Sequence, residues 1–279
     1  MADGCPFLSL VLSRFLPFRR EFFLPTVANC LLIGNHLIVR VAKTLGETSN
    51  SCENLKEKKR PKKIKTTDGY VLRLSFPSMG SLTVCTLLRF NPHCSGRSTV
   101  FSYSIPSYIN EFQLRANLNQ GKPVQLALLV HGIHGPYHDA FNYDDSWHSV
   151  CVSWSQNGGR WAIYAHGHAV SAAEGLNSTD NIGRGGLFII GQEQDTFGGS
   201  FKSDESFSGS ITELHIWNRV LNSSEISSME KKCSLVSSGL VFKWSEAAME
   251  IETSLTKQWS DSPCQGTLIR MQSDDMVKS

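Results

Sequence analysis

Short runs of apolar residues, or of alternating apolar and polar residues, follow one another from about residue 68 onward. Glycine, proline, asparagine and aspartate separate the runs, and these residues favour turns. Runs that are rich in β-branched and aromatic residues are typical of β-strands. They are YVLRLSFP, SLTVCTLLRF, STVFSYSI, EFQLRANL, PVQLALLV, WHSVCVSW, WAIYAHG, GLFIIGQ, SITELHIWN and GLVFKW, with AHGHAV at 165–170 as a hairpin tip. The pattern predicts an all-β sandwich.

A helix is predicted between two of these strands, in the segment LNSSEISSMEKKC at 221–233. Asn222 can cap the N-terminus of this helix, and Glu225, three residues further on, can complete a capping box. Ile226 and Met229 fall on one face at helical spacing, which indicates that this face is buried.

Residues 1–67 have a different character from the rest of the chain. The first apolar stretch is interrupted by charges, which is not the order of a signal peptide. The segment 23–42 approaches the length of a membrane span but contains polar and charged residues, so only an atypical signal anchor fits it. The segment 54–65 is a basic linker, either a solvated tether or a segment for nuclear import or for binding an anionic surface. We therefore expect a poorly ordered segment 1–67, a folded domain at 68–268 and a disordered tail at 269–279.

Charge and cysteine content narrow the class of protein. The net charge of +2 over 279 residues gives no reason to expect a nucleic-acid partner. Eight cysteines with no CxxC pair favour structural disulfides in an oxidising compartment, although reduced buried thiols are the alternative. Asn177 and Asn222 begin Asn-x-Ser/Thr sequons, which carry glycans only in the secretory pathway. Asn177 is the better candidate, because a glycan on Asn222 would compete with its role as a helix cap.

The order of the motifs resembles the pentraxin domain, the family of C-reactive protein, serum amyloid P and the neuronal pentraxins, with similar modules in some adhesion G-protein-coupled receptors. SLTVC, VCVSWS, GGLFIIGQEQDTFGGSF and FSGSITELHIWNRVL occur in that order before the capped helix, within 68–265. The resemblance implies a pentraxin/concanavalin-like jelly roll, a β-sandwich of two antiparallel sheets with one short helix on a face. The family signature His-x-Cys-x-Ser/Thr-Trp-x-Ser/Thr is incomplete, because Ser149 and Gln156 stand at its first and last positions. This departure puts the strict signature in doubt and leaves the fold in place.

The resemblance also implies which cysteines pair. It places a disulfide between Cys85 of LTVC and Cys151 of VCVSW. A second bridge between Cys233 and Cys264 is expected on weaker grounds, since spacing alone does not fix connectivity. The nearest candidate partner of Cys94 is Cys52, and the sequence leaves Cys5 and Cys30 unassigned.

A calcium site is a further implication of the resemblance, because Ca²⁺ binds six to eight oxygens and favours carboxylates. The candidate ligands that match the family pattern are Asn110, Glu193, Gln194, Asp195 and Glu205. Two positions break the pattern, since Ile109 stands at an aspartate position and Lys202 at a bridging glutamate position. Two readings follow. In one, a single weak calcium site is retained; in the other, the turn is kept and Lys202 pairs with Glu193 or Asp195 without metal.

A glycosidase is the main enzymatic alternative. Glu193-x-Asp195 begins the Glu-x-Asp-x-x-Glu pattern of jelly-roll glycosidases, but Gly198 occupies the second catalytic position. The sequence therefore predicts that the protein is not an enzyme.

Histidine and tryptophan residues complete the candidate sites. His131, His134 and His138 lie in a Gly/Pro-rich segment without a full set of zinc ligands, so we expect solvent-exposed loop residues. Four tryptophans in or beside apolar runs are expected in the core: Trp154, Trp161, Trp217 and Trp244.

The function that the resemblance implies is recognition or adhesion outside the cell, without catalysis. The protein would be a glycoprotein, secreted or membrane-associated, that binds phosphorylated head groups, glycans or extracellular proteins with the help of calcium. The alternative is a calcium-independent protein–protein interaction module of a receptor ectodomain or its isoform. Homo-oligomers occur in the family, so self-assembly is a further expectation.

Overall fold

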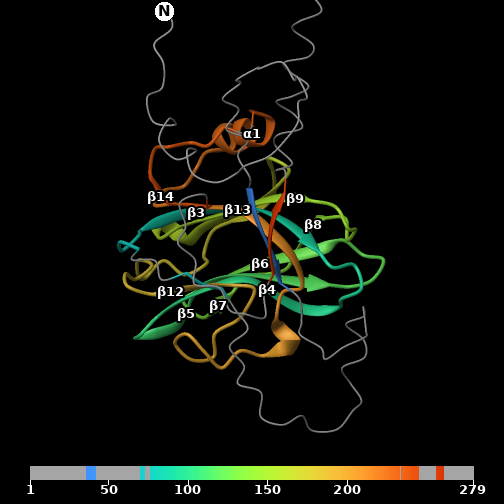
Figure 1. Cartoon of the computed structure of the whole chain (residues 1–279). Coiled ribbons are helices and arrows are strands. Elements are labelled where there is room, and N and C mark those ends of the chain that lie inside the picture. The colour runs from blue at the N-terminus through green and yellow to red at the C-terminus, as the bar shows by residue number, and fades with distance from the viewer. Residues whose placement is uncertain (1–35, 42–69, 73–75, 233, 245–255, 261–279) are drawn as a thin grey trace, which may run out of the picture. The chain divides into compact units, whose positions relative to one another are not determined.

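The structure is a computed structural model that describes residues 36–41, 70–72, 76–232, 234–244 and 256–260 (Figure 1). Most of these residues form strands in two antiparallel sheets, and one short α-helix lies among them. The predicted fold class, a two-sheet β-sandwich with a helix on one face, is confirmed.

The larger sheet has eight strands among the described residues, in the order β11-β10-β9-β3-β13-β1-β15, with β14 paired to β13. Its strands are β1 (His36–Val41), β3 (Ser81–Phe90), β9 (His148–Ser155), β10 (Arg160–Ala165), β11 (His168–Ala173), β13 (Gly209–Trp217), β14 (Leu240–Lys243) and β15 (Thr256–Ser260). The short 3-10 turn η2 (Asn157–Gly159) connects β9 to β10. The predicted hairpin tip at 165–170 is the turn between β10 and β11.

The second sheet has seven strands in the described part of the chain, in the order β2-β12-β4-β5-β6-β7, with β8 paired to β6. Its strands are β2 (Tyr70–Leu72), β4 (Gly96–Ile105), β5 (Tyr108–Leu118), β6 (Val124–Val130), β7 (Ile133–His134), β8 (His138–Phe141) and β12 (Leu187–Ile190). A loop containing the 3-10 turn η3 (Ser203–Glu205) leads from β12 back to β13 in the larger sheet.

The main core lies between the two sheets, and aromatic side chains fill much of it. Phe101 of β4 stacks on Phe188 of β12 with 5.0 Å between ring centroids, and on Phe112 of β5 with 5.8 Å. The indole N–H of the fully buried Trp154 donates to the carbonyl oxygen of Leu176 at 2.7 Å. All four tryptophans predicted in the core are buried: Trp154, Trp161, Trp217 and Trp244.

A second, smaller apolar cluster lies on the larger sheet beneath α1 (Ser223–Lys232), which covers that sheet in Figure 1. Trp217 belongs to this cluster rather than to the main core, and Ile226 of the helix packs with it. The predicted capping box is present. The Asn222 Oδ1 atom accepts the Glu225 N–H at 2.8 Å, and the Glu225 Oε2 atom accepts the Asn222 N–H at 2.9 Å.

One expectation about the N-terminal segment is wrong. Residues 1–67 were predicted to be poorly ordered, yet β1 pairs with both β13 and β15 in the larger sheet. Strand β1 forms because both neighbours satisfy its backbone hydrogen bonds, which the local sequence does not reveal. No helix among the described residues is long and apolar enough to span a membrane.

The disulfide between Cys85 and Cys151 is confirmed. These residues lie directly opposite each other on β3 and β9, and they are 66 positions apart in the sequence. Cys94 is also disulfide-bonded. The other cysteines in the predicted pairings lie outside the described residues: Cys5, Cys30, Cys52, Cys233 and Cys264.

Replacing both residues of the bridge, Cys85→Ala with Cys151→Ala, is expected to lower the free energy of unfolding by about 4 kcal/mol. The reason is the entropy that a crosslink across a loop of this length removes from the unfolded chain. Urea denaturation followed by circular dichroism measures the change. A reductant is a poorer test, because Cys94 is disulfide-bonded too. A loss below about 1 kcal/mol would contradict the assignment of a stabilising crosslink.

Candidate functional site

The candidate ligands lie around the loop 191–208, which follows β12 and runs along β4. The Gly191 N–H donates to the Val100 carbonyl oxygen at 2.9 Å, and Ser206 forms an isolated bridge with Thr99. The Phe207 N–H donates back to the Gly191 carbonyl oxygen at 2.9 Å, which closes the loop at its base. The backbone thus fixes both ends of the loop on the seven-stranded sheet.

Gln194 holds the loop through its side chain. Its carboxamide is completely buried. The Oε1 atom accepts from the Ser104 hydroxyl at 2.6 Å and from the Gly198 N–H at 2.9 Å. The Nε2 atom donates to the carbonyl oxygens of Ser102 and Leu187, each at 3.2 Å. A fully satisfied buried amide of this kind specifies one loop conformation without any ligand.

Glu193 lies against an arginine that the sequence analysis did not identify. The Glu193 carboxylate is buried, and its Oε1 atom is 3.2 Å from a guanidinium nitrogen of Arg115 on β5. The Gln113 amide donates to the same oxygen at 3.5 Å. The sequence did hold a signal for this contact, because Glu111, Gln113 and Arg115 place polar residues at every second position of a strand.

Asp195 is paired with Lys202. The Lys202 Nζ atom is 2.9 Å from one carboxylate oxygen of Asp195 and 3.2 Å from the other. Lys202 therefore occupies the position that the pairing reading gave it, next to Asp195 rather than Glu193. The ion pair raises the pKa of Lys202, mainly through the hydrogen bond to Asp195.

Asn110 and Glu205 reach the site by different routes. The Gln113 amide donates to the Asn110 Oδ1 atom at 2.9 Å, so Gln113 joins Asn110 to Glu193. Glu205 lies apart from this pair and faces Arg97 of β4, with 3.4 Å between its Oε1 atom and the guanidinium. Ile109 brings an apolar side chain to the beginning of β5.

These residues do not fit the two-ion calcium site that the resemblance implies. Both carboxylates of the Glu-Gln-Asp run have a cationic partner in the protein, Arg115 for Glu193 and Lys202 for Asp195. Nowhere in the described ranges do three or more histidine, cysteine, aspartate or glutamate side chains form a group that could hold a metal ion. A calcium ion would have to displace two charges that are already in contact with its ligands.

The expectation of a solvent-exposed histidine cluster is wrong for His131. Its side chain is 9% exposed, and its Nε2 atom lies 3.5 Å from the buried carboxylate of Glu111. Burial alone would lower the pKa of His131, but the contacts with Glu111 outweigh burial and raise the pKa. His134 is exposed, as expected, and His138 lies half-buried in β8. The error arose because a turn rich in glycine was assumed to be open to solvent.

The fold and this loop define a jelly-roll domain of the pentraxin type. The family model described as Pentaxin family matches residues 61–258. The chain therefore belongs to the pentraxin family.

Comparison with individual proteins agrees with this assignment. The chain is 36% identical over 184 residues to the human adhesion G protein-coupled receptor D2, which covers 66% of this chain and 19% of the receptor. It is 31% identical over 198 residues to neuronal pentraxin-2 of Cavia porcellus, which covers 71% of this chain and 44% of that protein. The chain thus spans less than half the length of these relatives.

A solved structure supports the fold. The native heptameric SAP-like pentraxin of Limulus polyphemus superposes with a TM-score of 0.66 and 23% sequence identity, covering 81% of this chain and 96% of that chain. The likeness confirms the pentraxin jelly roll.

Burial, and then the like charge of Asp195, raise the pKa of Glu193 above its ordinary value of 4.5. Asp195→Asn is therefore expected to lower this pKa, and Arg115→Gln to raise it. An NMR titration of the Glu193 carboxyl carbon measures both shifts. Because the fold raises the pKa, Glu193 holds more protons in the folded than in the unfolded protein. Its contribution to stability therefore falls as the pH rises through the range above 4.5.

Glu205→Gln is the matched control for the pKa of Glu193, since Glu205 makes the smallest of the contributions to it. This variant is expected to lower the pKa by less than Asp195→Asn does. A Glu193 pKa that is unchanged or raised in Asp195→Asn would contradict the electrostatic coupling.

Proposed function

We propose that this chain is a non-catalytic extracellular recognition domain that binds a protein partner without calcium. The observation that carries the proposal is the pair of internal cations at the loop 191–208, Lys202 on Asp195 and Arg115 on Glu193. Membership of the pentraxin family supports a role in recognition. The Cys85–Cys151 disulfide supports an oxidising, extracellular compartment.

The electrostatic argument concerns what the loop needs in order to keep its shape. In a calcium site, the metal offsets the mutual repulsion of clustered carboxylates. In this loop the ammonium of Lys202 and the guanidinium of Arg115 supply the compensating charge from within the chain. The Gln194 side chain fixes the backbone through hydrogen bonds to both neighbouring strands. The loop therefore keeps a defined surface at any calcium concentration.

The choice of a protein partner follows from the same charges. Phosphorylated head groups and glycans are the ligands that a calcium-assisted site would favour, and this proposal removes the metal. A relative of this chain is named as an adhesion receptor, and an interaction module within a receptor ectodomain matches that name. The proposed domain runs over 68–268 together with strand β1, and the tail 269–279 follows it. The Limulus pentraxin is a heptamer, so self-association is worth measuring in the same preparation.

Calcium addition is expected to leave the melting temperature of the full chain unchanged, to within about 1 °C, from EDTA up to about 5 mM calcium. A ligand that binds only the folded state must raise this temperature, so a flat series means that no calcium binds in this range. The double variant Ile109→Asp with Lys202→Glu restores both missing carboxylates. It is expected to gain a calcium-dependent rise of a few degrees, roughly what a gain of 1 kcal/mol gives.

Lys202→Gln is the matched control for the melting experiment, because it removes the cation without adding a calcium ligand. It is expected to show no rise with calcium. A rise in the unmodified chain that Asp195→Ala abolishes would overturn the proposal in favour of the weak calcium site.

Glycosylation is expected at Asn177 rather than Asn222 when the chain is secreted from cells. The Asn222 side chain caps α1, whereas Asn177 lies in a turn beside the exposed residues Ser178 and Thr179. Digestion with an N-glycosidase, followed by mass spectrometry, measures the attached glycan. Asn177→Gln and Thr179→Ala should each remove it, and Asn222→Gln should not. A glycan that persists in both Asn177→Gln and Thr179→Ala would show the assignment to be wrong.

A further inference from the structure

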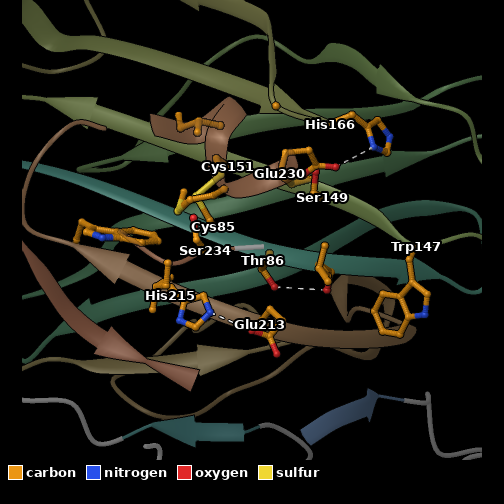
Figure 2. Close-up of a pocket in the computed structure, with 17 residues that line it drawn as sticks. Cys85, Thr86, Trp147, Ser149, Cys151, His166, Glu213, His215, Glu230 and Ser234 are labelled. Carbon is orange, nitrogen blue, oxygen red and sulfur yellow. Dashed lines mark hydrogen bonds and ion pairs between the residues drawn. A yellow bond between two sulfur atoms is a disulfide. The ribbon is translucent and has the colours of Figure 1, made fainter. Parts of the chain in front are cut away.

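A pocket of about 270 Å³ lies on the larger sheet beneath α1, far in the fold from the loop 191–208 (Figure 2). The Cys85–Cys151 disulfide lies in its lining, together with Met229 of the helix and Leu235. Trp147, from the segment before β9, lines it at one side. A space of this size suits one side chain of a partner rather than a larger ligand.

The charges that line the pocket are negative. Glu213 comes from β13 and Glu230 from α1, so the sheet and the helix each contribute one carboxylate (Figure 2). None of the described residues that line the pocket is a lysine or an arginine. Lys231 and Lys232 follow Glu230 along the helix, but both are exposed and neither lines the pocket.

Glu213 is held in position by a neutral histidine. The Nδ1 atom of His215 accepts the Trp244 backbone N–H at 3.3 Å, so the ring proton is on Nε2. That Nε2–H donates to the Glu213 Oε2 atom at 3.2 Å. A neutral donor orients the carboxylate and leaves its negative charge in place.

The backbone at Glu213 also departs from a regular strand. The pairing of β13 with β3 shifts register between Thr212 and His215, which marks a β-bulge. Glu213 lies in this bulge with φ of +52°, a conformation that is uncommon for a residue other than glycine. Bulges redirect side chains and are frequent beside binding sites. Here the bulge accompanies a carboxylate in the pocket lining.

Glu230 lies at the end of a chain of polar contacts. The His148 Nε2 atom is 2.8 Å from the Asp144 carboxylate, and the His148 Nδ1 atom is 3.0 Å from the His166 Nε2 atom. When both rings are neutral, His148 donates to Asp144 and His166 donates to His148. The remaining nitrogen of His166, Nδ1, then carries no proton, and it faces the Glu230 carboxylate at 4.0 Å. Glu230 thus receives no hydrogen bond from His166 in this state.

We propose that this pocket binds the guanidinium group of an arginine side chain on a partner protein. A guanidinium is planar, stacks on an aromatic ring and donates several hydrogen bonds to carboxylates. Trp147 offers the ring, and Glu213 and Glu230 offer the carboxylates. Met229 and Leu235 can contact the aliphatic stem of the arginine.

The ring of Trp147 already has one arginine contact within the protein. The guanidinium carbon of Arg89 lies 5.4 Å from the ring centroid, and Arg89 also pairs with Asp145 at 3.7 Å. Arg89 does not line the pocket, so the pocket side of the ring is left to the partner. The charge of Asp145 offsets that of Arg89, which limits its repulsion of an incoming cation. This site does not depend on the proposal for the loop 191–208.

The test uses the full chain and a defined probe, N-acetyl-arginine N-methylamide, with the citrulline analogue as its neutral, isosteric control. The readout is the NMR signal of the Trp147 indole N–H, assigned by its absence in Trp147→Phe. The arginine probe is expected to shift this signal in a saturable manner. The citrulline analogue is expected to bind about tenfold more weakly, because it loses the charge-assisted hydrogen bonds.

Glu230→Gln is expected to weaken binding of the arginine probe about tenfold for the same reason. Glu174→Gln, an exposed position outside the pocket lining, is the matched control and should leave the affinity unchanged. Lowering the pH from about 7.5 to about 5.5 should weaken binding several-fold, since a protonated His166 can pair with Glu230. This pH effect should be smaller in Glu230→Gln. The groups in contact with His166 are His148 on β9, which bonds Asp144, and Glu230 on α1.

Equal affinity for the arginine and citrulline probes would overturn the proposal, as would an unchanged affinity in Glu230→Gln. A shift of the Trp147 signal that does not saturate would overturn it as well. Each of these results is independent of the calcium series, which reports on the other sheet.

Discussion

The register between β3 and β9 is the constraint on which both faces of the larger sheet depend. Cys85 and Cys151 are direct partners in this register, and the disulfide prevents the two strands from slipping past each other. A slip of one residue would turn every side chain of a strand to the opposite face. With the register fixed, Val84 and Val152 point into the main core, while the cysteines join the cluster beneath α1. The disulfide therefore sets what the core contains and what the helix covers.

The same alternation produces polar layers on both sheets. In the seven-stranded sheet, Gln113 and Arg115 follow each other on one face of β5 and meet the buried carboxylate of Glu193. Burying that carboxylate costs free energy unless a partner offsets its charge, and Arg115 is the partner within reach. In the larger sheet, a bulge in β13 interrupts the alternation next to Glu213. One face of each sheet thus serves the core, and the other presents fixed charges.

Local patterns sufficed to predict most of the fold. The alternating runs gave the strands from β3 to β14, and the Asn222–Glu225 capping box gave the start of α1. The loop ligands could be named from the family resemblance, but their partners could not. The contact of Arg115 with Glu193 joins strand β5 to a distant loop, and no local pattern specifies such a contact. Strand β1 was missed for the same reason, because it exists only by pairing with β13 and β15.

The two departures from the family pattern at the loop have one physical consequence. Ile109 removes a carboxylate, and Lys202 replaces a second carboxylate with a cation, so the repulsion that a metal would relieve is already reduced. A cation tethered to the chain remains beside Asp195 at any ion concentration, whereas a bound metal would exchange with the solvent. With Gln194 fully hydrogen-bonded beneath it, the loop has both its shape and its charge balance from within. Recognition at this face then depends on the surface of the loop itself, and on how well a partner protein complements it.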